Sequence, residues 1–528
     1  MRWIDYFDRG WQISPDGPCL IDDDASGDPT VHTYTEIRNL TLRIAGALED
    51  AGIGKGRHGA VLSPNHPLSV AATLAIMRAG LVWVPLNPRN ALAENAGILD
   101  RFDCDVLFYH HSFADSLAEM QRKAPRIQRW ICLDPAEDDP VAESLASFIA
   151  NQAAEERVFA YDPLDTVMMA GTGGTTGEPK GVQQSHRATE IQTLAIMAVM
   201  PFQRRPVYLA VAPLTHATGY ITYPIFAQGG TVVLQRAPDV ARVLAAIPRH
   251  SVSALFLPPT VIYALLDDPG VRDVNFSSLE YFIYGASPMS PSRLREAIAV
   301  MGPVFFQMFG QTETLFPLTW LSREEHFVDG KIGSAIAADD RLRTCGRAGP
   351  GVDVAIMDPD GRLLPDGEVG EIVCRTEMVM TGYYKNPDAT AEASAHGWFH
   401  TGDMGRRDGE GYFYIVDRVR DMIITGGFNV YSTEVESALH AHPAVGECAV
   451  VGVPDEKWGE AIKAVVELKA GSQAGEDELI SHCKALIGSV KAPKSVDFIE
   501  QIPRSAVGKV LKRALRDGYW AGHDRQVG

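Results

Sequence analysis

The chain has 528 residues and a formal net charge of −19 at pH 7. An acidic surplus of this size argues against nucleic acid and anionic membranes as general partners, because both are bound through basic surface. At roughly 150 residues per domain, the length allows three or four compact units with sizeable cores.

Membrane-spanning and secreted classes are also disfavoured. The longest apolar stretch, residues 70–86, is interrupted by Arg78, Gly80 and Pro85, so it does not have the continuous apolar length of a spanning helix. Residues 1–6 lack the charged start and apolar run of a secretory signal, and we expect a cytoplasmic chain. Seven scattered cysteines without metal-ligand spacing predict reduced, buried thiols.

Helical and strand patterns alternate through most of the chain. Residues 34–51 and 68–78 have apolar positions at helical spacing. Short apolar runs of strand type, bounded by Gly, Pro or polar turns, lie at residues 60–62, 81–86, 207–212, 231–235 and 254–257. This alternation predicts an α/β fold of layered subdomains with largely buried strands.

The pattern changes in the last third. Residues 352–376 contain short strand-like segments with two Asp-Gly turns, which predict a small β-rich subdomain. Beyond Asp421, a helical segment at 432–441 and strand-like segments at 447–453 and 462–468 predict a small α/β domain.

Glycines, hydroxyls and one lysine crowd into residues 169–182. Glycines let backbone N–H groups approach anionic oxygens, and threonine and lysine add donors, so this segment suits a phosphate chain. It is not a Walker A loop, because Glu178 and Pro179 separate Gly177 from Lys180. A flexible surface loop is the alternative interpretation.

A second motif, residues 307–313, follows the apolar run 303–306, which we interpret as a buried strand ending in a tight turn. A carboxylate beyond a strand end, here Glu313, can hold Mg²⁺ together with substrate phosphates. Three further motifs lie at 398–403, 417–421 and 503–509.

These five ordered motifs resemble the adenylate-forming superfamily of acyl-CoA synthetases, adenylation domains and luciferases, most closely the bacterial acyl-CoA synthetases. The resemblance spans residues 34–516. It implies an N-terminal AMP-binding domain, residues 1–419, and a mobile C-terminal domain, residues 420–528. It places Arg420 at the hinge, although an exposed turn residue would have the same pattern.

The resemblance also implies the chemistry and its residues. ATP, Mg²⁺ and coenzyme A would be the cofactors, with Lys509, Thr312, Glu313 and His216 catalytic and with Glu313 and Thr175 at the metal. The nucleotide-binding set comprises Thr172, Gly173, Gly174, Thr175, Thr176, Gly177, Lys180, Gly285, Ala286, Ser287, Phe309, Gly310, Gln311, Thr312, Asp403, Arg418 and Lys509. Gly173 departs from the family's serine. Without the other motifs, the better interpretation of Lys509 would be a residue of a solvated basic segment, and that of Asp403 a turn-capping residue.

The remaining implied residues belong to the acyl group and the thiol. The acyl pocket comprises His216, Tyr220, Gly285, Gly310, Leu315 and Phe316, and the coenzyme A path comprises Gly426, Gly427 and Trp458. The apolar lining favours a monocarboxylic acid, aliphatic or aromatic, as the small-molecule substrate, and its chain length is left open. Two alternatives remain: loading of a carrier-protein pantetheine thiol, and a nucleotide sensor without activity. The oligomeric state is left open.

Overall fold

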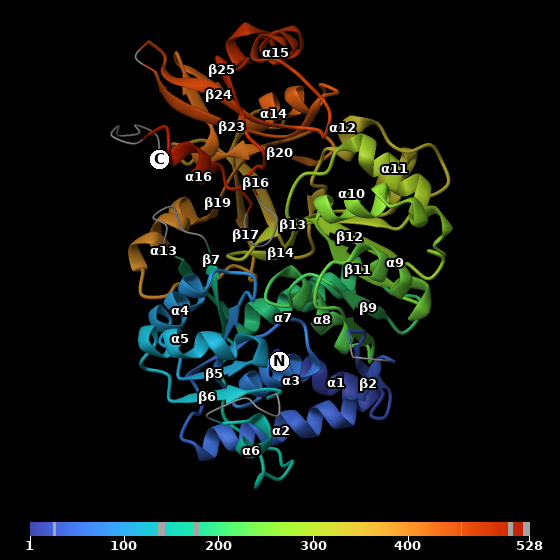
Figure 1. Cartoon of the computed structure of the whole chain (residues 1–528), viewed down its shortest axis with the longest axis vertical. Coiled ribbons are helices and arrows are strands. Elements are labelled where there is room, and N and C mark those ends of the chain that lie inside the picture. The colour runs from blue at the N-terminus through green and yellow to red at the C-terminus, as the bar shows by residue number, and fades with distance from the viewer. Residues whose placement is uncertain (25–27, 136–142, 173–178, 456, 505–509, 521–528) are drawn as a thin grey trace. The chain divides into compact units, whose positions relative to one another are not determined.

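The computed structural model describes residues 1–24, 28–135, 143–172, 179–455, 457–504 and 510–520 (Figure 1). These residues form two compact units. The first unit is Met1–Asp353 with Arg375–Phe399, and the second is Val354–Cys374 with His400–Gly528. Each is described by itself, and a pivot at residues 419–420 remains a prediction.

The first unit contains two large sheets. The nine-stranded sheet is parallel from β13 to β1 and antiparallel at both margins. Its strands, in spatial order, are β15 (Arg347–Ala348), β14 (Leu315–Leu321), β13 (Phe305–Gln311), β12 (Tyr281–Gly285), β11 (Ala254–Leu257), β9 (Val207–Ala210), β10 (Thr231–Leu234), β1 (Pro18–Asp22) and β2 (Thr30–Thr33).

The seven-stranded sheet combines a parallel core with an antiparallel margin. Its order is β18 (Gly382–Tyr383), β8 (Lys180–Ser185), β7 (Thr166–Thr172), β4 (Val82–Leu86), β3 (His58–Leu62), β5 (Val106–Tyr109) and β6 (Arg129–Cys132). The strands β3, β4 and β5 are almost entirely buried, which explains their continuous apolar sequences.

Helices flank these strands. They are α1 (Asp5–Ile13), α2 (Tyr34–Asp50), α3 (Pro67–Arg78), α4 (Leu92–Arg101), α5 (Leu117–Lys123), α6 (Leu145–Phe148), α7 (His186–Val199), α8 (Ala217–Phe226), α9 (Val240–Arg249), α10 (Pro259–Asp267), α11 (Pro291–Met301), α12 (Asp339–Leu342) and α13 (Pro387–Ala393). Helix α2 begins at a capping box, in which Thr33 and Glu36 satisfy each other's backbone N–H groups.

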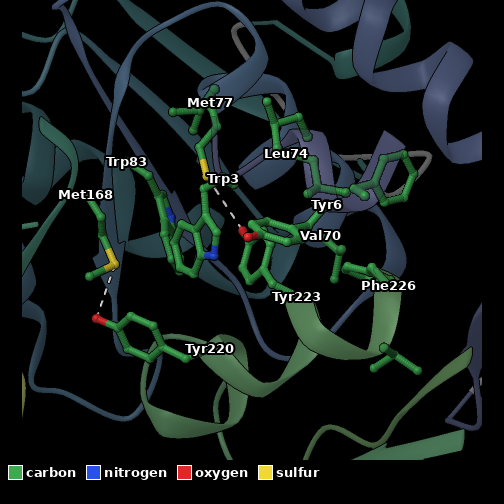
Figure 2. Close-up of a cluster of buried hydrophobic side chains, with 14 of the residues drawn as sticks. Trp3, Tyr6, Val70, Leu74, Met77, Trp83, Met168, Tyr220, Tyr223 and Phe226 are labelled. Atoms are coloured by element: carbon green, nitrogen blue, oxygen red, sulfur yellow. Dashed lines mark hydrogen bonds between the residues drawn. The ribbon is translucent and has the colours of Figure 1, made fainter. Parts of the chain in front are cut away.

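An aromatic cluster joins the N-terminal residues to α3, α8 and both sheets (Figure 2). The rings of Trp3 and Tyr223 stack with centroids 3.8 Å apart. The Tyr223 hydroxyl donates to Met77 Sδ, and the Tyr220 hydroxyl donates to Met168 Sδ (Figure 2). The cluster fixes one face of α8, the helix that follows His216.

The second unit also contains two sheets. The four-stranded sheet has the order β16 (Asp353–Met357), β17 (Gly370–Arg375), β19 (Phe399–Arg407) and β20 (Phe413–Arg418). The other sheet has the order β22 (Phe428–Val430), β21 (Ile423–Thr425), β24 (Gly459–Leu468) and β23 (Val445–Asp455), and β25 (Ser495–Phe498) also pairs with β24. Its helices are α14 (Ser432–His440), α15 (Glu476–Lys491) and α16 (Lys512–Asp517).

The mixed α/β class is confirmed, and the strand predicted at 303–306 differs most from its predicted extent. We expected a strand over 303–306 that ended in a turn before Glu313, but β13 continues to Gln311. Residues 307–311 pair with β14, so hairpin pairing continues the strand beyond the apolar run, through the mixed sequence Gln-Met-Phe-Gly-Gln. All seven cysteines are free and buried. Among the described residues, no helix combines the length and apolarity needed to cross a membrane.

Candidate functional site

The glycine-rich segment connects the two strands of a hairpin. Strands β7 and β8 are antiparallel, and Thr172 lies opposite Lys180 where the pairing ends. The connecting residues Gly173, Gly174, Thr175, Thr176 and Gly177 lie outside the described part of the chain. The hairpin thus places one threonine and one lysine at the two ends of the predicted phosphate loop.

Lys180, Tyr383 and Glu313 lie together beside this hairpin. Lys180 Nζ is 4.8 Å from the centroid of the Tyr383 ring, a cation–π contact. The Tyr383 hydroxyl donates to Glu313 Oε1 across 3.1 Å. Burial and the neighbouring Glu313 carboxylate raise the pKa of Tyr383, so the phenol stays protonated and remains a donor at neutral pH.

Strand pairing explains why Tyr383 reaches this place. The two-residue strand β18 adds to the margin of β8, with Tyr383 opposite Val182. The backbone N–H of Thr381 donates to Gln183 O, and the N–H of Tyr384 donates to Gly181 O. Sequence reasoning missed Tyr383, because so short a strand has no periodicity.

Thr312 and Glu313 occupy the turn between β13 and β14. The Gln184 side-chain amide donates to Thr312 O, and the Met380 N–H donates to Glu313 O. Gly310 is required here because a Cβ at that position would lie 2.1 Å from Leu315 O. These backbone contacts position the Glu313 carboxylate, a hard oxygen ligand of the kind that Mg²⁺ prefers.

The predicted adenine wall follows β12. Gly285 lies beside Met308 in the neighbouring strand β13, and a Cβ at Gly285 would approach Met308 O to 2.5 Å. Ala286 has a φ of 66° and is exposed, as is Ser287. Phe309, partly buried, follows Met308 on β13. The pairing of β12 with β13 therefore brings the Gly285 turn next to the strand that carries Phe309. The roles of these residues at adenine remain predictions.

His216 immediately precedes α8. Its Nε2 lies 3.1 Å from the Asn87 side-chain amide, and Asn87 follows β4. Asn65, after β3, accepts from the Leu214 N–H and donates to Ala212 O. The two asparagines hold the loop that carries His216. Sequence reasoning missed both, since an isolated asparagine gives no signal of a partner more than a hundred residues away.

Two residues of the predicted acyl pocket meet directly. The rings of Tyr220, on α8, and Phe316, on β14, pack edge to face with centroids 5.8 Å apart. Leu315 is buried, with a φ of 57°, next to Phe316. With Gly310 against the Leu315 carbonyl, these residues form an apolar corner.

In the second unit, Asp403 and Arg418 form an ion pair. They lie opposite each other on β19 and β20, and Arg418 Nε is 3.2 Å from Asp403 Oδ1. Asp403 is buried, whereas 43% of the Arg418 side chain is exposed. The backbone N–H of Asp403 donates to Thr401 Oγ1. The pair thus has the donor and acceptor expected at ribose hydroxyls.

The three residues of the predicted coenzyme A path also lie together. Gly426 and Gly427, with φ of 58° and 81°, form the two-residue turn between β21 and β22. The Gly426 N–H donates to Trp458 O, and a Cβ at Gly426 would lie 2.5 Å from Trp458 Cε3. Trp458 is 41% exposed and Phe428 is 59% exposed, so this turn presents aromatic surface.

Two further predicted residues are Arg420 and Lys509. Arg420 lies in the 3₁₀ turn Val419–Asp421, and its carbonyl accepts from Arg516 Nη1. Lys509 lies outside the described residues. Arg504 and Val510 form a β-bridge, so the residues on either side of 505–509 are adjacent.

The structure therefore places the predicted residues in two groups. The first unit carries Thr172, Lys180, Thr312, Glu313, the Gly285 turn and His216. The second unit carries the Asp403–Arg418 pair and the Gly426 turn. Their roles remain predictions.

Comparisons with known proteins identify the family of the chain. The family model described as AMP-binding enzyme matches residues 7–384, and the AMP-binding enzyme C-terminal domain matches residues 434–509. The medium/long-chain fatty-acid–CoA ligase FadD8 of Mycobacterium tuberculosis is 36% identical over 91% of this chain and 85% of its own. A feruloyl-CoA synthase from an Amycolatopsis species is 36% identical over 92% and 94%.

Among solved structures, the amide bond synthetase McbA of Marinactinospora thermotolerans is 30% identical and has a TM-score of 0.86. The alignment covers 98% of this chain and all of that one. The family match extends over most of the chain, and the similar proteins are matched over nearly their full lengths. The chain belongs to the AMP-binding enzyme family.

Proposed function

We propose that this chain is an AMP-forming acid–thiol ligase, which activates a monocarboxylic acid with ATP and transfers the acyl group to coenzyme A. Family membership supports the reaction class. The observation that carries the proposal is the juxtaposition of Lys180, Tyr383 and Glu313 beside the glycine-rich hairpin. This juxtaposition supports the proposal because it combines a cation, which suits a polyphosphate, with a carboxylate, which suits the accompanying metal.

In the first half-reaction, an oxygen of the acid attacks the α-phosphorus of ATP and the bond to pyrophosphate breaks. Negative charge then grows on phosphoryl oxygens, and positioned donors lower the barrier. Lys180, Thr172 and the Thr312 hydroxyl are the donors we assign from the described residues. Glu313 would hold Mg²⁺, which supplies Lewis acidity at the phosphates when bound. Lys509 is proposed to bridge the carboxylate and the α-phosphate.

In the second half-reaction, the thiol of coenzyme A attacks the acyl carbon and AMP leaves. The turn at Gly426 and Gly427 allows close approach of an extended ligand because neither residue carries a Cβ. Exposed Trp458 and Phe428 beside it offer apolar surface for a pantetheine arm. Arg420 is proposed as the pivot that brings this turn to the adenylate.

The acid is proposed to be aliphatic or aromatic with one carboxylate. Tyr220, Leu315 and Phe316 form an apolar corner near His216, and such a lining favours apolar acyl groups. The relatives named for medium- and long-chain fatty acids and for ferulate support the same class. Asn87 holds His216, which we assign to orienting the acid.

A pyrophosphate-release assay across a panel of carboxylic acids tests the proposal. Each acid is assayed with ATP and Mg²⁺, and then with coenzyme A, pantetheine or a simple amine as the acceptor. We expect acid-dependent pyrophosphate release and a thioester of coenzyme A detected by mass spectrometry. Preference for a carrier-bound thiol or for the amine would reassign the acceptor. Absence of release with every acid would favour the inactive-sensor alternative.

The variant Lys509→Ala tests the division of labour between the half-reactions. It should lower adenylate formation by orders of magnitude and leave thioester formation from supplied acyl-adenylate nearly unchanged. Equal loss of both steps contradicts the assigned role.

A further inference from the structure

Two histidines and an aspartate meet at the carboxyl ends of neighbouring parallel strands. His110 and His111 follow β5, and Asp134 lies two residues beyond β6. Tyr109 and Cys132 are register partners in these strands, so the residues that follow them emerge at the same edge of the sheet. None of the three belongs to the groups assigned to ATP, acid or thiol.

The three side chains have the spacing of metal ligands. Asp134 Oδ2 lies 3.1 Å from His110 Nε2 and 2.9 Å from His111 Nδ1. All three ligand atoms lie within 4.8 Å of one another. Tetrahedral zinc bonds of about 2.0–2.2 Å separate neighbouring ligand atoms by roughly 3.3 Å. Small side-chain adjustments would therefore let all three atoms coordinate one ion.

His110 supplies an independent indication that a ligand belongs here. The residue is only 3% exposed, and its Nε2 makes no aligned hydrogen bond with any described residue, although Asp134 Oδ2 lies 3.1 Å away. A buried polar atom without a partner is unfavourable, and a coordinated cation would satisfy it.

Neighbouring groups orient the three ligands. The His111 N–H donates to Asp134 Oδ1 across 3.1 Å, which holds Oδ2 toward both imidazoles. His110 Nδ1 lies 2.9 Å from Ser112 Oγ. The Ser112 backbone N–H donates to the same Nδ1 across 3.1 Å. A metal at Nε2 would move the ring proton to Nδ1, so this contact would have to give way to donation from Nδ1–H to Ser112 Oγ, the kind of supporting contact that metal-binding histidines make. The His111 side chain is 44% exposed, which gives an ion access from solvent.

We propose that His110, His111 and Asp134 form a binding site for a divalent transition-metal ion, with Zn²⁺ the reference ion and water completing the coordination. Two imidazoles and one carboxylate suit Zn²⁺, Ni²⁺ or Cu²⁺, whereas Mg²⁺ prefers oxygen ligands alone. The site is therefore chemically separate from Glu313.

Zinc titration of the full-length, tag-free, chelator-treated chain without nucleotide tests this site. Calorimetry or competition with a chromogenic chelator should show one saturable equivalent. His111→Ala, an exposed change that should leave the fold intact, and Asp134→Asn should each weaken Zn²⁺ binding at least tenfold. Co²⁺ should give a visible d–d absorption band in the wild type that Asp134→Asn removes. A large excess of Mg²⁺ should not displace the ion.

The matched control is His250→Ala. His250 Nε2 lies 2.7 Å from Asp23 Oδ1, a buried imidazole–carboxylate pair elsewhere in the same unit. This variant should bind Zn²⁺ like the wild type. Equal loss in His250→Ala and His111→Ala, or no saturable equivalent in the wild type, overturns the proposal. Circular dichroism of each variant separates unfolding from ligand loss.

Discussion

Two carboxylates near strand ends, Glu313 in the first unit and Asp417 in the second, are held in different ways. One oxygen of Glu313 accepts from the Tyr383 hydroxyl, while backbone contacts position the residue. Asp417 is only 3% exposed and accepts from the N–H and hydroxyl of Ser432, and Lys512 Nζ donates to that same hydroxyl.

The difference separates a proposed metal ligand from a structural anchor. Burial raises the pKa of Asp417, and Lys512 with the Ser432 hydrogen bonds offsets part of that effect. Lys512 also pairs with Glu436 Oε1 at 2.7 Å, which ties α16 to α14. Protein groups thus use the acceptor capacity of Asp417, whereas in the described part of the chain the Glu313 side chain accepts from Tyr383 alone, which is consistent with the metal-binding role we propose. Arg418, next to Asp417 at the end of β20, pairs with Asp403 instead. The end of β20 therefore carries both the structural anchor Asp417 and a residue that we propose binds the ribose.

The largest expected effect is on catalysis at Glu313. Glu313→Gln retains size and shape but removes the charge, and it should lower adenylation by roughly 100- to 1,000-fold with little change in melting temperature. Pyrophosphate release over a Mg²⁺ series and thermal unfolding measure the two properties. Glu377→Gln, on an exposed side chain in the same unit, is the control and should remain active. A stable, fully active Glu313→Gln protein would remove this residue from the site.

Lys512→Met should reverse that pattern and act mainly on stability. It leaves the buried Asp417 carboxylate and the largely buried Glu436 carboxylate without their cation, a change we expect to cost about 3 kcal/mol. Urea unfolding measures this loss. Lys491→Met breaks a more exposed pair with Glu434 in the same unit and should cost less than about 1 kcal/mol. Equal losses in the two variants would show that burial does not distinguish them.

Sequence patterns predicted local elements well and long-range partners poorly. The helix at 34–51 and the strand at 254–257 follow from apolar spacing and were found within a residue. We predicted that β13 would end too early. Hairpin pairing with β14 extends the strand, and the apolar pattern of the sequence does not encode this pairing. Tyr383 reaches Glu313 through a two-residue strand, and Asn87 reaches His216 across the fold. Such contacts depend on topology rather than on local sequence.

A smaller effect is expected at the turn of the second unit. Gly426→Ala and Gly427→Ala both place a Cβ at positive φ, at a cost of roughly 1–2 kcal/mol each. Only the Cβ added by Gly426→Ala would press on Trp458. Among the described residues, no atom lies within 4 Å of a Cβ built at Gly427, its chain neighbours aside. Gly426→Ala should therefore alter tryptophan fluorescence, which Gly427→Ala should leave unchanged. Both variants should slow thioester formation from supplied acyl-adenylate, and Gly426→Ala should slow it more because it also displaces Trp458. Matching rates in the two variants would separate Trp458 from the thiol path.

The smallest effect is a pH dependence of stability at His440. Burial alone would lower the pKa of this imidazole, but its hydrogen bond to Glu447 Oε1, 2.8 Å away, and the Glu447 charge raise it above the ordinary value of 6.5. The folded protein then binds the proton more tightly than the unfolded chain. The resulting stabilisation is complete below about pH 6.5 and is lost as the pH rises through the higher folded value.

His440→Gln should therefore destabilise the protein slightly at about pH 5.5 and have a smaller effect at about pH 8.5. Urea midpoints across this range measure the difference between variant and wild type. His482→Gln is the control, because His482 faces the backbone carbonyl of Ala438 instead of a carboxylate. Parallel curves for wild type and His440→Gln at every pH would show that the His440–Glu447 pair contributes no proton-linked stability, since loss of packing alone does not titrate.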